Sequence, residues 1–541
     1  MDHDPNTRDI YLDVNATSPV LPAALAAASE AMTGCFGNPS SSHAAGLRAR
    51  QILDQTRARA RRVLGAGEGE GEGVDAGRVL FTSGATEGIQ TAVLSALCAI
   101  RERRAAGEPC GDLLLYGATE HKAVSESLAH WNRLLGTNLA LRALPVGLDG
   151  RHDLAMLREL APRAAMVCTM AANNETGVIS DLDGIAGVLD SYAPHAYWMV
   201  DCVQALGKLP LGLAATRIDY APFSGHKLYA PKGIGMLYVR AGAPYTPLMI
   251  GGGQEAGQRS GTENMAGIAA LGAVLAALEE GATFRSHREM AAMRDRLAGA
   301  LHDAFPAVVF NTPFEHALPT TLNFAVPGMP SQALLDLFDA AGVRVSAGSA
   351  CSAAKAAPSY VLEAMGLPLW RSSGAVRLSF GPLADDAFID AACARIRRCG
   401  EAARGAGLGH GAEVDGGARS LLPDVDSGPH TDGDGAAQLQ PAALRQFLAA
   451  HQDALLIDVR EPAEIALAGA ANLHGRAALA LPLSRLADHL DDLLAAPRRP
   501  LLFVCRSGKR SASAALYLRR AGHAQSWTLA GGVALADSCI A

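Results

Sequence analysis

The sequence predicts an α/β fold with a largely parallel sheet, followed by a linker and a second, smaller α/β domain. Over residues 1–400, short apolar segments alternate with amphipathic or alanine-rich stretches, a pattern typical of strands joined by crossover helices. Residues 401–437 are rich in Gly, Asp, Ser and Pro, which indicates a flexible interdomain linker. Residues 438–541 contain two further apolar segments, each followed by a helical pattern, and so predict a separate domain.

The individual elements follow from the same alternation. Residues 89–104 are expected to form a helix between the first two strands. After the linker, residues 454–459 and 501–504 are expected to be strands, and residues 512–520 a helix. The strands expected before the linker are residues 78–82, 112–116, 165–170, 196–201 and 235–239.

Composition and charge exclude several classes of protein. The 541 residues are 49% hydrophobic and 19% charged, which is ordinary for a globular chain with large cores. The net charge of −7 provides no basic face, so we expect no direct nucleic-acid partner. The longest apolar stretch, residues 265–278, ends at two glutamates and is shorter than the ~18 residues of a membrane span, so no membrane partner is expected.

The N-terminus and the cysteines indicate a cytoplasmic protein. The first nine residues are acidic and polar, unlike a secretory signal. The ten cysteines include no Cys-x-x-Cys pair, which suits a reducing compartment and argues against structural zinc. We therefore expect no metal site.

Lys227 lies in a short polar segment, Phe-Ser-Gly-His-Lys-Leu-Tyr-Ala-Pro-Lys-Gly, just before a predicted strand. A lysine flanked by Ser, Gly and His can reach an aldehyde and form a Schiff base. On this segment alone, a solvated surface lysine is the alternative interpretation.

Three further segments favour a cofactor site around Lys227. Asp201 ends an apolar strand with a carboxylate of the kind that holds a pyridinium nitrogen protonated. Residues 81–88 join a strand to a helix start and could bind a phosphate, although an ordinary Ser/Thr N-cap is the alternative. His121 also follows a strand, and could stack on a ring and move protons or be structural. Loops after the strand ends of an α/β sheet meet in one crevice, so these segments can share a site.

Eight segments, in order along the chain, resemble the motifs of the group I cysteine desulfurases of the class V pyridoxal-phosphate family. The resemblance covers about residues 8–400. It implies a class V transferase fold, with a large, mostly parallel mixed-sheet domain (about residues 16–255) and a small α/β domain (residues 1–15 and 256–400). The segments are Tyr11–Thr17, Gly37–His43, Thr82–Glu87, Asn173–Gly177, Phe223–Lys227, Arg259–Thr262, Cys351 with its neighbours, and Ala375–Ser379.

The resemblance implies roles at a pyridoxal 5'-phosphate site, residue by residue. Lys227 would form the Schiff base, Asp201 would pair with the pyridine nitrogen, and His121 would stack on the ring and act as acid and base. Asn174 and Gln204 would contact the ring hydroxyl. The phosphate would be bound by Ala85, Thr86, Ser224 and His226, and by Thr262 of the neighbouring subunit, which implies a homodimer.

The resemblance also implies the substrate and the reaction. Arg377 would hold the carboxylate of L-cysteine. Cys351, as a thiolate, would attack the substrate sulfur, leaving L-alanine and an enzyme persulfide. The small residues around Cys351 suit a loop that moves, and a plain surface loop has the same composition. The segment Asp13-Val14-Asn15 is a mild departure from the family, which usually has Asp-Asn-Asn or Asp-Tyr-Ser there.

Cys505 lies in a second setting that suits a reactive thiol, Cys-Arg-Ser-Gly-Lys-Arg-Ser, between a predicted strand and a predicted helix. Successive backbone N–H groups around Cys505, the dipole of the following helix, and the cations of Arg506, Lys509 and Arg510 would favour a thiolate or an anionic persulfide. A buried cysteine at a strand end is the alternative. A cysteine phosphatase needs arginine six positions after the cysteine, where this chain has Ser511, so that reaction is not expected.

Residues 438–541 resemble a rhodanese domain. Residues 456–464, Leu-Ile-Asp-Val-Arg-Glu-Pro-Ala-Glu, match the family's entry motif, and residues 529–532, Leu-Ala-Gly-Gly, match the late one. Residues 471–476 depart from the family's Gly-His-Ile segment, and no tryptophan follows Gly532. The resemblance implies a second sulfur-transferring cysteine at Cys505.

These observations predict a homodimeric cysteine desulfurase whose persulfide passes from Cys351 to Cys505. The sulfur acceptor would be a protein such as an iron–sulfur scaffold, a tRNA-thiolating enzyme or a thiocofactor carrier. Thiosulfate is an alternative donor to Cys505. A class V enzyme of other specificity, a selenocysteine lyase or an aminotransferase, is the alternative function, with the rhodanese-like domain as a binding module.

Overall fold

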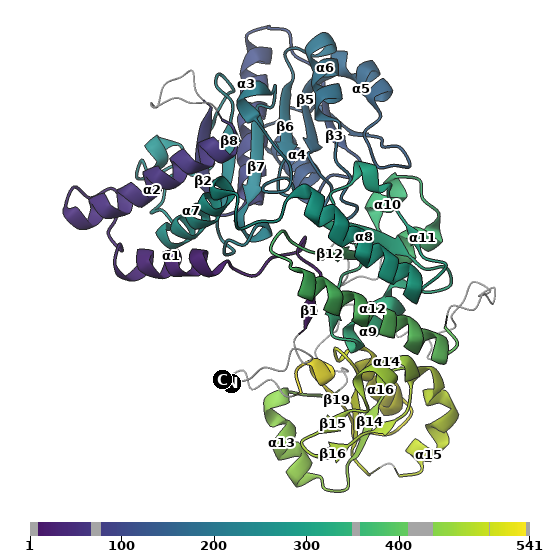
Figure 1. Ribbon diagram of the computed structural model, residues 1–541. Coiled ribbons are helices and arrows are strands. Elements are labelled where there is room, and N and C mark those ends of the chain that lie inside the picture. Colours follow the sequence, from purple (N-terminus) through teal and green to yellow (C-terminus); the bar gives the residue numbers. More distant parts are fainter. Residues whose placement is uncertain (1–8, 67–76, 349–357, 409–436, 497, 537–541) are drawn as a thin grey trace.

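The computed structural model describes residues 9–66, 77–348, 358–408, 437–496 and 498–536 (Figure 1). Cys351 lies outside these ranges. Figure 1 shows three regions along the molecule: a large domain, a small domain, and a C-terminal domain on the side of the small domain that faces away from the large one.

The large domain is built on a seven-stranded sheet in the order β2-β8-β7-β6-β5-β3-β4. Neighbouring strands are parallel except at β8, which runs antiparallel to β2 and β7. Every residue of β5 is buried, as expected for a sheet covered on both faces. The strands are β2 (Arg78–Thr82), β3 (Leu113–Gly117), β4 (Ala140–Leu144), β5 (Ala164–Met170), β6 (Tyr197–Asp201), β7 (Tyr220–Ser224) and β8 (Gly235–Val239).

Helices cover both faces of this sheet. On one face, α3 (Ala85–Ala105) and α4 (Lys122–Leu134) bury Leu114 and Met199 of the strands. On the other, a larger core includes Trp198 and is closed by five helices. These are α1 (Pro22–Thr33), α2 (Ala44–Val63), α5 (Leu154–Leu160), α6 (Leu182–Tyr192) and α7 (Met265–Glu280).

The small domain joins the start of the chain to the segment after α7. An antiparallel sheet in the order β12-β10-β9 packs against its helices, and β1 (Ile10–Tyr11) pairs in parallel with β11 (Val343–Arg344). Residues from both ends of this region therefore share one core. The remaining elements are α8 (His287–Ala304), β9 (Val309–Phe310), β10 (Thr321–Ala325), α9 (Ser331–Ala340), α10 (Tyr360–Ala364), α11 (Leu369–Gly374), β12 (Val376–Ser379) and α12 (Asp386–Gly405).

The C-terminal domain has a five-stranded parallel sheet in the order β13-β19-β18-β14-β17. The domain also has a two-stranded antiparallel ribbon, β15-β16, which lies between α14 and β17 in the sequence. Its elements are β13 (Ala437–Leu439), α13 (Pro441–Ala450), β14 (Leu455–Asp458), α14 (Pro462–Ala468), β15 (Asn472–Leu473), β16 (Arg476–Ala477), β17 (Leu479–Ala480), α15 (Leu490–Leu494), β18 (Leu501–Val504), α16 (Lys509–Arg520) and β19 (Ser526–Leu529).

The α/β class and all seven strands predicted from the sequence are confirmed, and no strand end shifts by more than one residue. Two strands of the large sheet were not predicted: β4, which is mostly solvent-exposed, and β7, whose central Pro222 disfavours a strand assignment. The predicted start of the linker is wrong, because Glu401–Gly405 continue α12 and Leu408 N–H still bonds to the carbonyl of Ala403. No described helix is long and apolar enough to cross a membrane.

Gly235, the first residue of β8, marks a close approach of three chain segments. A Cβ atom at this position would lie 2.4 Å from the carbonyl oxygen of Phe223 and 2.7 Å from the Cα atom of Gly84. Both are backbone atoms that cannot move away cheaply. Gly235 therefore lets β8 come close to the turn that starts α3.

We expect Gly235→Ala to lower the free energy of unfolding of the large domain by about 1–3 kcal/mol, the usual cost of overpacking. Gly299→Ala is the matched control, because Gly299 is exposed in α8 with no atom within 4 Å of its added Cβ. The control should be stabilising by about 0.5–1 kcal/mol. Thermal unfolding followed by calorimetry tests this, and equal unfolding transitions for Gly235→Ala and wild type would contradict the close approach.

Candidate active site

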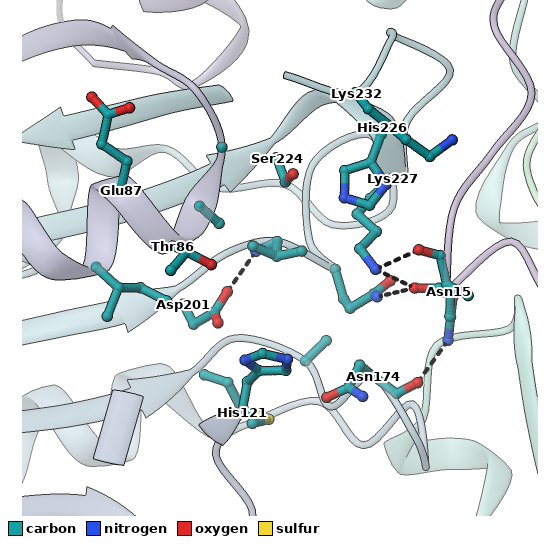
Figure 2. Close-up of a pocket in the computed structure, with 18 of the residues that line it drawn as sticks. Asn15, Thr86, Glu87, His121, Asn174, Asp201, Ser224, His226, Lys227 and Lys232 are labelled. Atoms are coloured by element: carbon teal, nitrogen blue, oxygen red, sulfur yellow. Dashed lines mark hydrogen bonds between the residues drawn. The ribbon is translucent and has the colours of Figure 1, made fainter. Parts of the chain in front are cut away.

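A cavity of about 510 Å³ opens where strand ends of the large sheet meet the small domain (Figure 2). Its wall includes the turn after β2, the loops after β3, β5, β6 and β7, the N-terminal segment, and β12. Every site residue predicted for one subunit of the cofactor and substrate site lines this cavity, although the residues are far apart in the sequence. They are Ala85, Thr86, His121, Asn174, Asp201, Gln204, Ser224, His226, Lys227 and Arg377.

Lys227 ends a short turn, Gly225–Lys227, that follows β7 directly. Its Nζ donates to the carbonyl oxygens of Asn15, at 2.7 Å, and of Ala16, at 2.8 Å. Figure 2 shows the side chain pointing into the cavity toward Asn15. Backbone oxygens thus hold the amine at one place in the cavity wall.

Asp201 and His121 both line the cavity, and the charge of each affects the pKa of the other. Asp201 is 7% exposed, and its Oδ1 accepts the N–H of Val203 at 2.9 Å. Burial raises the pKa of Asp201, while that hydrogen bond and the charges of His121 and Lys227 oppose the rise. Burial lowers the pKa of His121, with Asp201 opposing. The imidazole of His121 is therefore neutral near pH 7, and its Nδ1 accepts the N–H of Ala123 at 3.2 Å.

The first turn of α3 provides an anion site. Gly84 precedes the helix without any side-chain cap, so the first N–H groups of α3 face the cavity unsatisfied by a capping side chain. Ser224 and His226 face the same region (Figure 2). Burial, with the charges of Lys227 and Lys232, lowers the pKa of His226 to about 4. A neutral His226 and a helix N-terminus suit a phosphate that brings its own negative charge.

Glu87 positions this turn from behind. Its Oε2 accepts the N–H of Ser83 at 2.7 Å, and its Oε1 accepts Nε of Arg259 at 2.9 Å. Arg259 begins the predicted motif that contains Thr262. Thr262 itself is exposed and does not line this cavity.

A buried lysine, Lys208, supports the cavity and was not predicted from the sequence. Its Nζ donates to Oε1 of Gln204 at 2.7 Å and to Oδ1 of Asn15 at 3.4 Å. Gln204 in turn donates through Nε2 to the carbonyl of Asn15 at 3.1 Å. The i, i+4 spacing of Gln204 and Lys208 was the available signal, but the partner Asn15 is nearly 200 residues away.

Arg377 is almost fully buried at the border of the two domains. One terminal nitrogen donates to the carbonyl of Asn174 at 2.9 Å, and the other donates to Oδ1 of Asp13 at 2.5 Å and to Oγ of Ser346 at 2.8 Å. Its Nε has no hydrogen-bond partner among the described residues. The guanidinium thus sits at the cavity with unused capacity for an anion.

A second buried pair, Glu120 and His152, was also missed. His152 Nε2 lies 3.8 Å from Oε1 of Glu120, and neither atom has a hydrogen-bond partner among the described residues. Burial raises the pKa of Glu120 well above its ordinary value and lowers that of His152 to about 4. Glu120 directly precedes His121 in the sequence.

The described chain on either side of Cys351 is anchored at the same cavity. Ser346 pairs with Arg377 through both backbone groups, at 2.7 and 3.2 Å. On the far side, Ser359 donates its hydroxyl to Oε2 of Glu175 at 2.6 Å, next to Asn174 of the cavity wall. The described residues that flank the segment carrying Cys351 are therefore held beside Arg377 and Asn174 of the cavity wall.

Cys505 forms a separate site in the C-terminal domain. It follows β18, is 1% exposed, and its Sγ accepts from Gly508 N–H at 3.2 Å, Ser511 N–H at 3.4 Å and the Ser511 hydroxyl at 3.4 Å. The predicted cradle of donors around this sulfur is present. Two backbone N–H groups and one hydroxyl thus surround Sγ of Cys505.

The residues of the large cavity fit pyridoxal phosphate. A buried carboxylate, an uncapped helix N-terminus and a lysine amine line one cavity, and these groups suit the ring nitrogen, the phosphate and the aldehyde of that cofactor. The volume is within the range of small-molecule sites. Among the described residues, no cluster of three or more His, Cys, Asp or Glu side chains could hold a metal ion.

Comparisons with known proteins agree with this division of the chain. The model of the aminotransferase class-V family matches residues 10–391, and that of the rhodanese-like domain matches residues 440–535. A cysteine desulfurase of Gluconacetobacter diazotrophicus is 40% identical over 384 residues, which cover 70% of this chain and 90% of that protein. The cysteine desulfurase NifS of Azotobacter vinelandii is 36% identical over 385 residues, covering 71% and 90%.

Solved structures show the same likeness. A NifS-like protein is 29% identical, with a TM-score of 0.62, and the match covers 72% of this chain and 98% of that protein. The structure of SspA in complex with cysteine is 26% identical, with a TM-score of 0.57, covering 69% and 99%.

The charge of Lys208 gives a pH-dependent test of the site. Burial, with the charges of Lys227 and Arg377, lowers the pKa of Lys208 to about 7, whereas an unfolded lysine titrates near ~10.4. Between these values the unfolded chain binds a proton that the folded chain lacks, so the folded state gains stability as pH rises. We expect the unfolding free energy of wild type relative to Lys208→Met to increase by up to ~4 kcal/mol from pH 7 to pH 10.

Denaturant unfolding at several pH values measures this difference. Lys122→Met, at an exposed position on α4, controls for the loss of a lysine. A difference between wild type and Lys208→Met that does not change with pH would mean that Lys208 is hydrated in the folded protein.

Proposed function

Because the chain belongs to the class V aminotransferase family, as a homologue of cysteine desulfurases with a C-terminal rhodanese-like domain, we propose that it converts L-cysteine to L-alanine and transfers the sulfur. The sulfur is carried first on Cys351 and then on Cys505. The observation that carries this proposal is the cavity in which Lys227, Asp201 and the N-terminus of α3 meet.

In this proposal the cavity binds pyridoxal phosphate. Lys227 would hold it covalently, Asp201 would pair with the ring nitrogen, and His121 would stack on the ring. The bound cofactor supplies an electron sink for the negative charge left when the substrate Cα loses its proton. The phosphate and ring-hydroxyl contacts are assigned to Ala85, Thr86, Ser224, His226, Asn174 and Gln204.

Arg377 is proposed to bind the carboxylate of L-cysteine. Its Nε is free of partners among the described residues, and its bond to the carbonyl of Asn174 can be exchanged for a stronger, charge-assisted bond to a carboxylate. Asp13 and Ser346 hold the other terminal nitrogen in place during that exchange. The neutral imidazole of His121 is available to accept a proton from the bound substrate.

Cys351 is proposed as the first sulfur carrier. Its thiolate attacks the sulfur of the bound cysteine, forming an S–S bond as the substrate C–S bond breaks. The electron pair of that C–S bond remains with the carbon, which takes up a proton and leaves as L-alanine. The net change is cysteine plus a thiol giving alanine plus a persulfide, without any outside oxidant. The anchoring of Ser346 and Ser359 beside the cavity supports this role for the segment between them.

Cys505 is proposed as the second carrier. Its thiolate attacks the outer sulfur of the Cys351 persulfide, forming a persulfide on Cys505 and restoring the Cys351 thiolate. The contacts of Sγ of Cys505 with the N–H groups of Gly508 and Ser511 support a fixed position for the attacking sulfur. A sulfur-acceptor protein then receives the sulfur.

Homodimer formation is part of the proposal. Thr262, exposed and outside the cavity of its own chain, would reach the phosphate of the other subunit. Large apolar side chains also remain exposed in this chain, with Phe36 at 72% and Ile250 at 88%, and exposed apolar side chains favour burial against a second copy.

We expect Cys351→Ser to lose nearly all L-alanine formation from L-cysteine, by a factor of about 10³ or more, because no thiol remains to take the sulfur. The absorbance of lysine-bound cofactor should be unchanged. Cys98→Ser, at a half-buried position in α3, is the matched control. Full alanine formation by Cys351→Ser would contradict the proposed reaction, and rapid turnover of amino acids without sulfur would favour an aminotransferase.

The second step is tested by mass spectrometry of peptides after turnover of ³⁴S-labelled cysteine. The label should appear as a persulfide on Cys351 and then on Cys505 in wild type, and on Cys351 alone in Cys505→Ser. In Cys351→Ser, cysteine should label neither position, while thiosulfate should still be able to load Cys505. Label that never reaches Cys505 in wild type would disprove the transfer and favour a binding role for the C-terminal domain.

A further inference from the structure

Two arginines that follow Cys505 pack against helix α9 of the small domain, while Ser507 and Lys509 between them remain exposed. Arg506 Nε lies 3.0 Å from Oδ1 of Asp336, and its terminal nitrogen lies 3.3 Å from Oδ1 of Asp339. Arg510 lies 3.4 Å from Oδ2 of Asp336. Two cations from the Cys505 loop thus meet two acids from another domain.

An apolar contact accompanies these ion pairs. Helix α14 packs against both α9 and α12, on the side of the small domain that faces the C-terminal domain (Figure 1), and Ala463 is buried in the core of the small domain. Leu467 packs against the same core, and its carbonyl oxygen accepts from Arg398 of α12 at 3.5 Å. The C-terminal domain therefore contacts the small domain through the apolar side of α14 as well as through ion pairs.

Glu464 connects the helix to the cations. Its two oxygens accept from the two terminal nitrogens of Arg510, at 2.7 Å each. Burial raises the pKa of Asp336, and the charges of Arg510 and Arg506 act against that rise. A buried carboxylate of this kind is stable only while its cations remain beside it.

The consequence is that two of the three cations predicted to serve Cys505 are already paired with carboxylates. A cation that is paired in this way is less available to a persulfide or to an anionic sulfur compound. Cys505 itself is 1% exposed in this arrangement, so an external molecule cannot reach its sulfur.

We propose that α9 is a docking surface for the Cys505 loop, and that anionic sulfur donors and acceptors reach Cys505 only when Arg506 and Arg510 leave Asp336 and Asp339. The docked arrangement is the resting state of the chain. In it, the small domain lies between the Lys227 cavity and the Cys505 domain (Figure 1). Sulfur arriving from Cys351 therefore requires the undocked state as well. Access to Cys505 can be measured whether or not cysteine is the source of its sulfur.

The test is the rate at which N-ethylmaleimide, an uncharged reagent, alkylates Cys505 in the full-length protein, followed by peptide mass spectrometry. Asp336→Lys places a like charge opposite both arginines and should raise this rate about tenfold or more. Asp303→Lys is the matched control. It makes the same charge change on α8, where Asp303 forms an exposed ion pair with Arg397 of α12. Its rate should stay within about twofold of wild type.

A second measurement separates undocking from a change in the reactivity of the thiol. Hydrogen exchange of α14 should accelerate in Asp336→Lys while that of α8 stays as in wild type, which also shows that the small domain is folded. In wild type, raising salt from low to molar concentration should increase both the alkylation rate and the exchange of α14. Faster alkylation with unchanged exchange of α14, or no change in alkylation at all, would overturn the proposal.

Discussion

The path of the N-terminal segment across the cavity is the constraint on which the active site depends. The carbonyl oxygens of Asn15 and Ala16 hold the amine of Lys227. The side chain of Asn15 donates to the carbonyl of Asn174 and to Oγ1 of Thr321, so the same residue fastens the segment to both domains. Because the contacts to Lys227 come from the backbone, the position of this segment, more than the identity of its side chains, places the reactive amine.

The same segment explains why the small domain belongs to the site. β1 pairs with β11, and Asp13, two residues after β1, holds Arg377 of β12. A rearrangement of the small domain would therefore move Arg377 and the carbonyl groups around Lys227 together. Lys208 also holds this segment in place, through hydrogen bonds to Gln204 and Asn15. Its amine is buried, and this burial lowers the pKa of Lys208.

The two sulfur sites differ in their electrostatic surroundings, and this difference separates their roles. The Lys227 cavity gathers donors and cations for an anionic cofactor and substrate. At Cys505, Glu464 and the two acids of α9 offset the cations of the loop. The backbone of that loop is fixed by the turn at Gly531 and Gly532, since Val533 N–H donates to the carbonyl of Cys505 at 2.9 Å. Only its charges are thus left to respond to docking.

Much of this could be predicted from the sequence, because strands with strong apolar patterns and ordered motifs place residues at the ends of a parallel sheet. The motifs brought Lys227, Asp201 and His121 into one cavity, as expected. The sequence could not predict Lys208, since its partner Asn15 is distant and a lysine pattern favours solvent. Nor could it predict that Asp336 pairs with Arg506, because that contact depends on how two folded domains pack.

The central claim is that one chain stores sulfur from cysteine on two different thiols. A burst experiment with excess L-cysteine and no added reductant or acceptor measures this most directly, by counting the L-alanine released per chain before turnover stops. Each alanine reports one sulfur atom retained by a thiol. The account predicts a burst of two alanines per chain in wild type and one in Cys505→Ser. A burst of one in both proteins would contradict transfer to Cys505, and no burst in wild type would contradict the cysteine chemistry altogether.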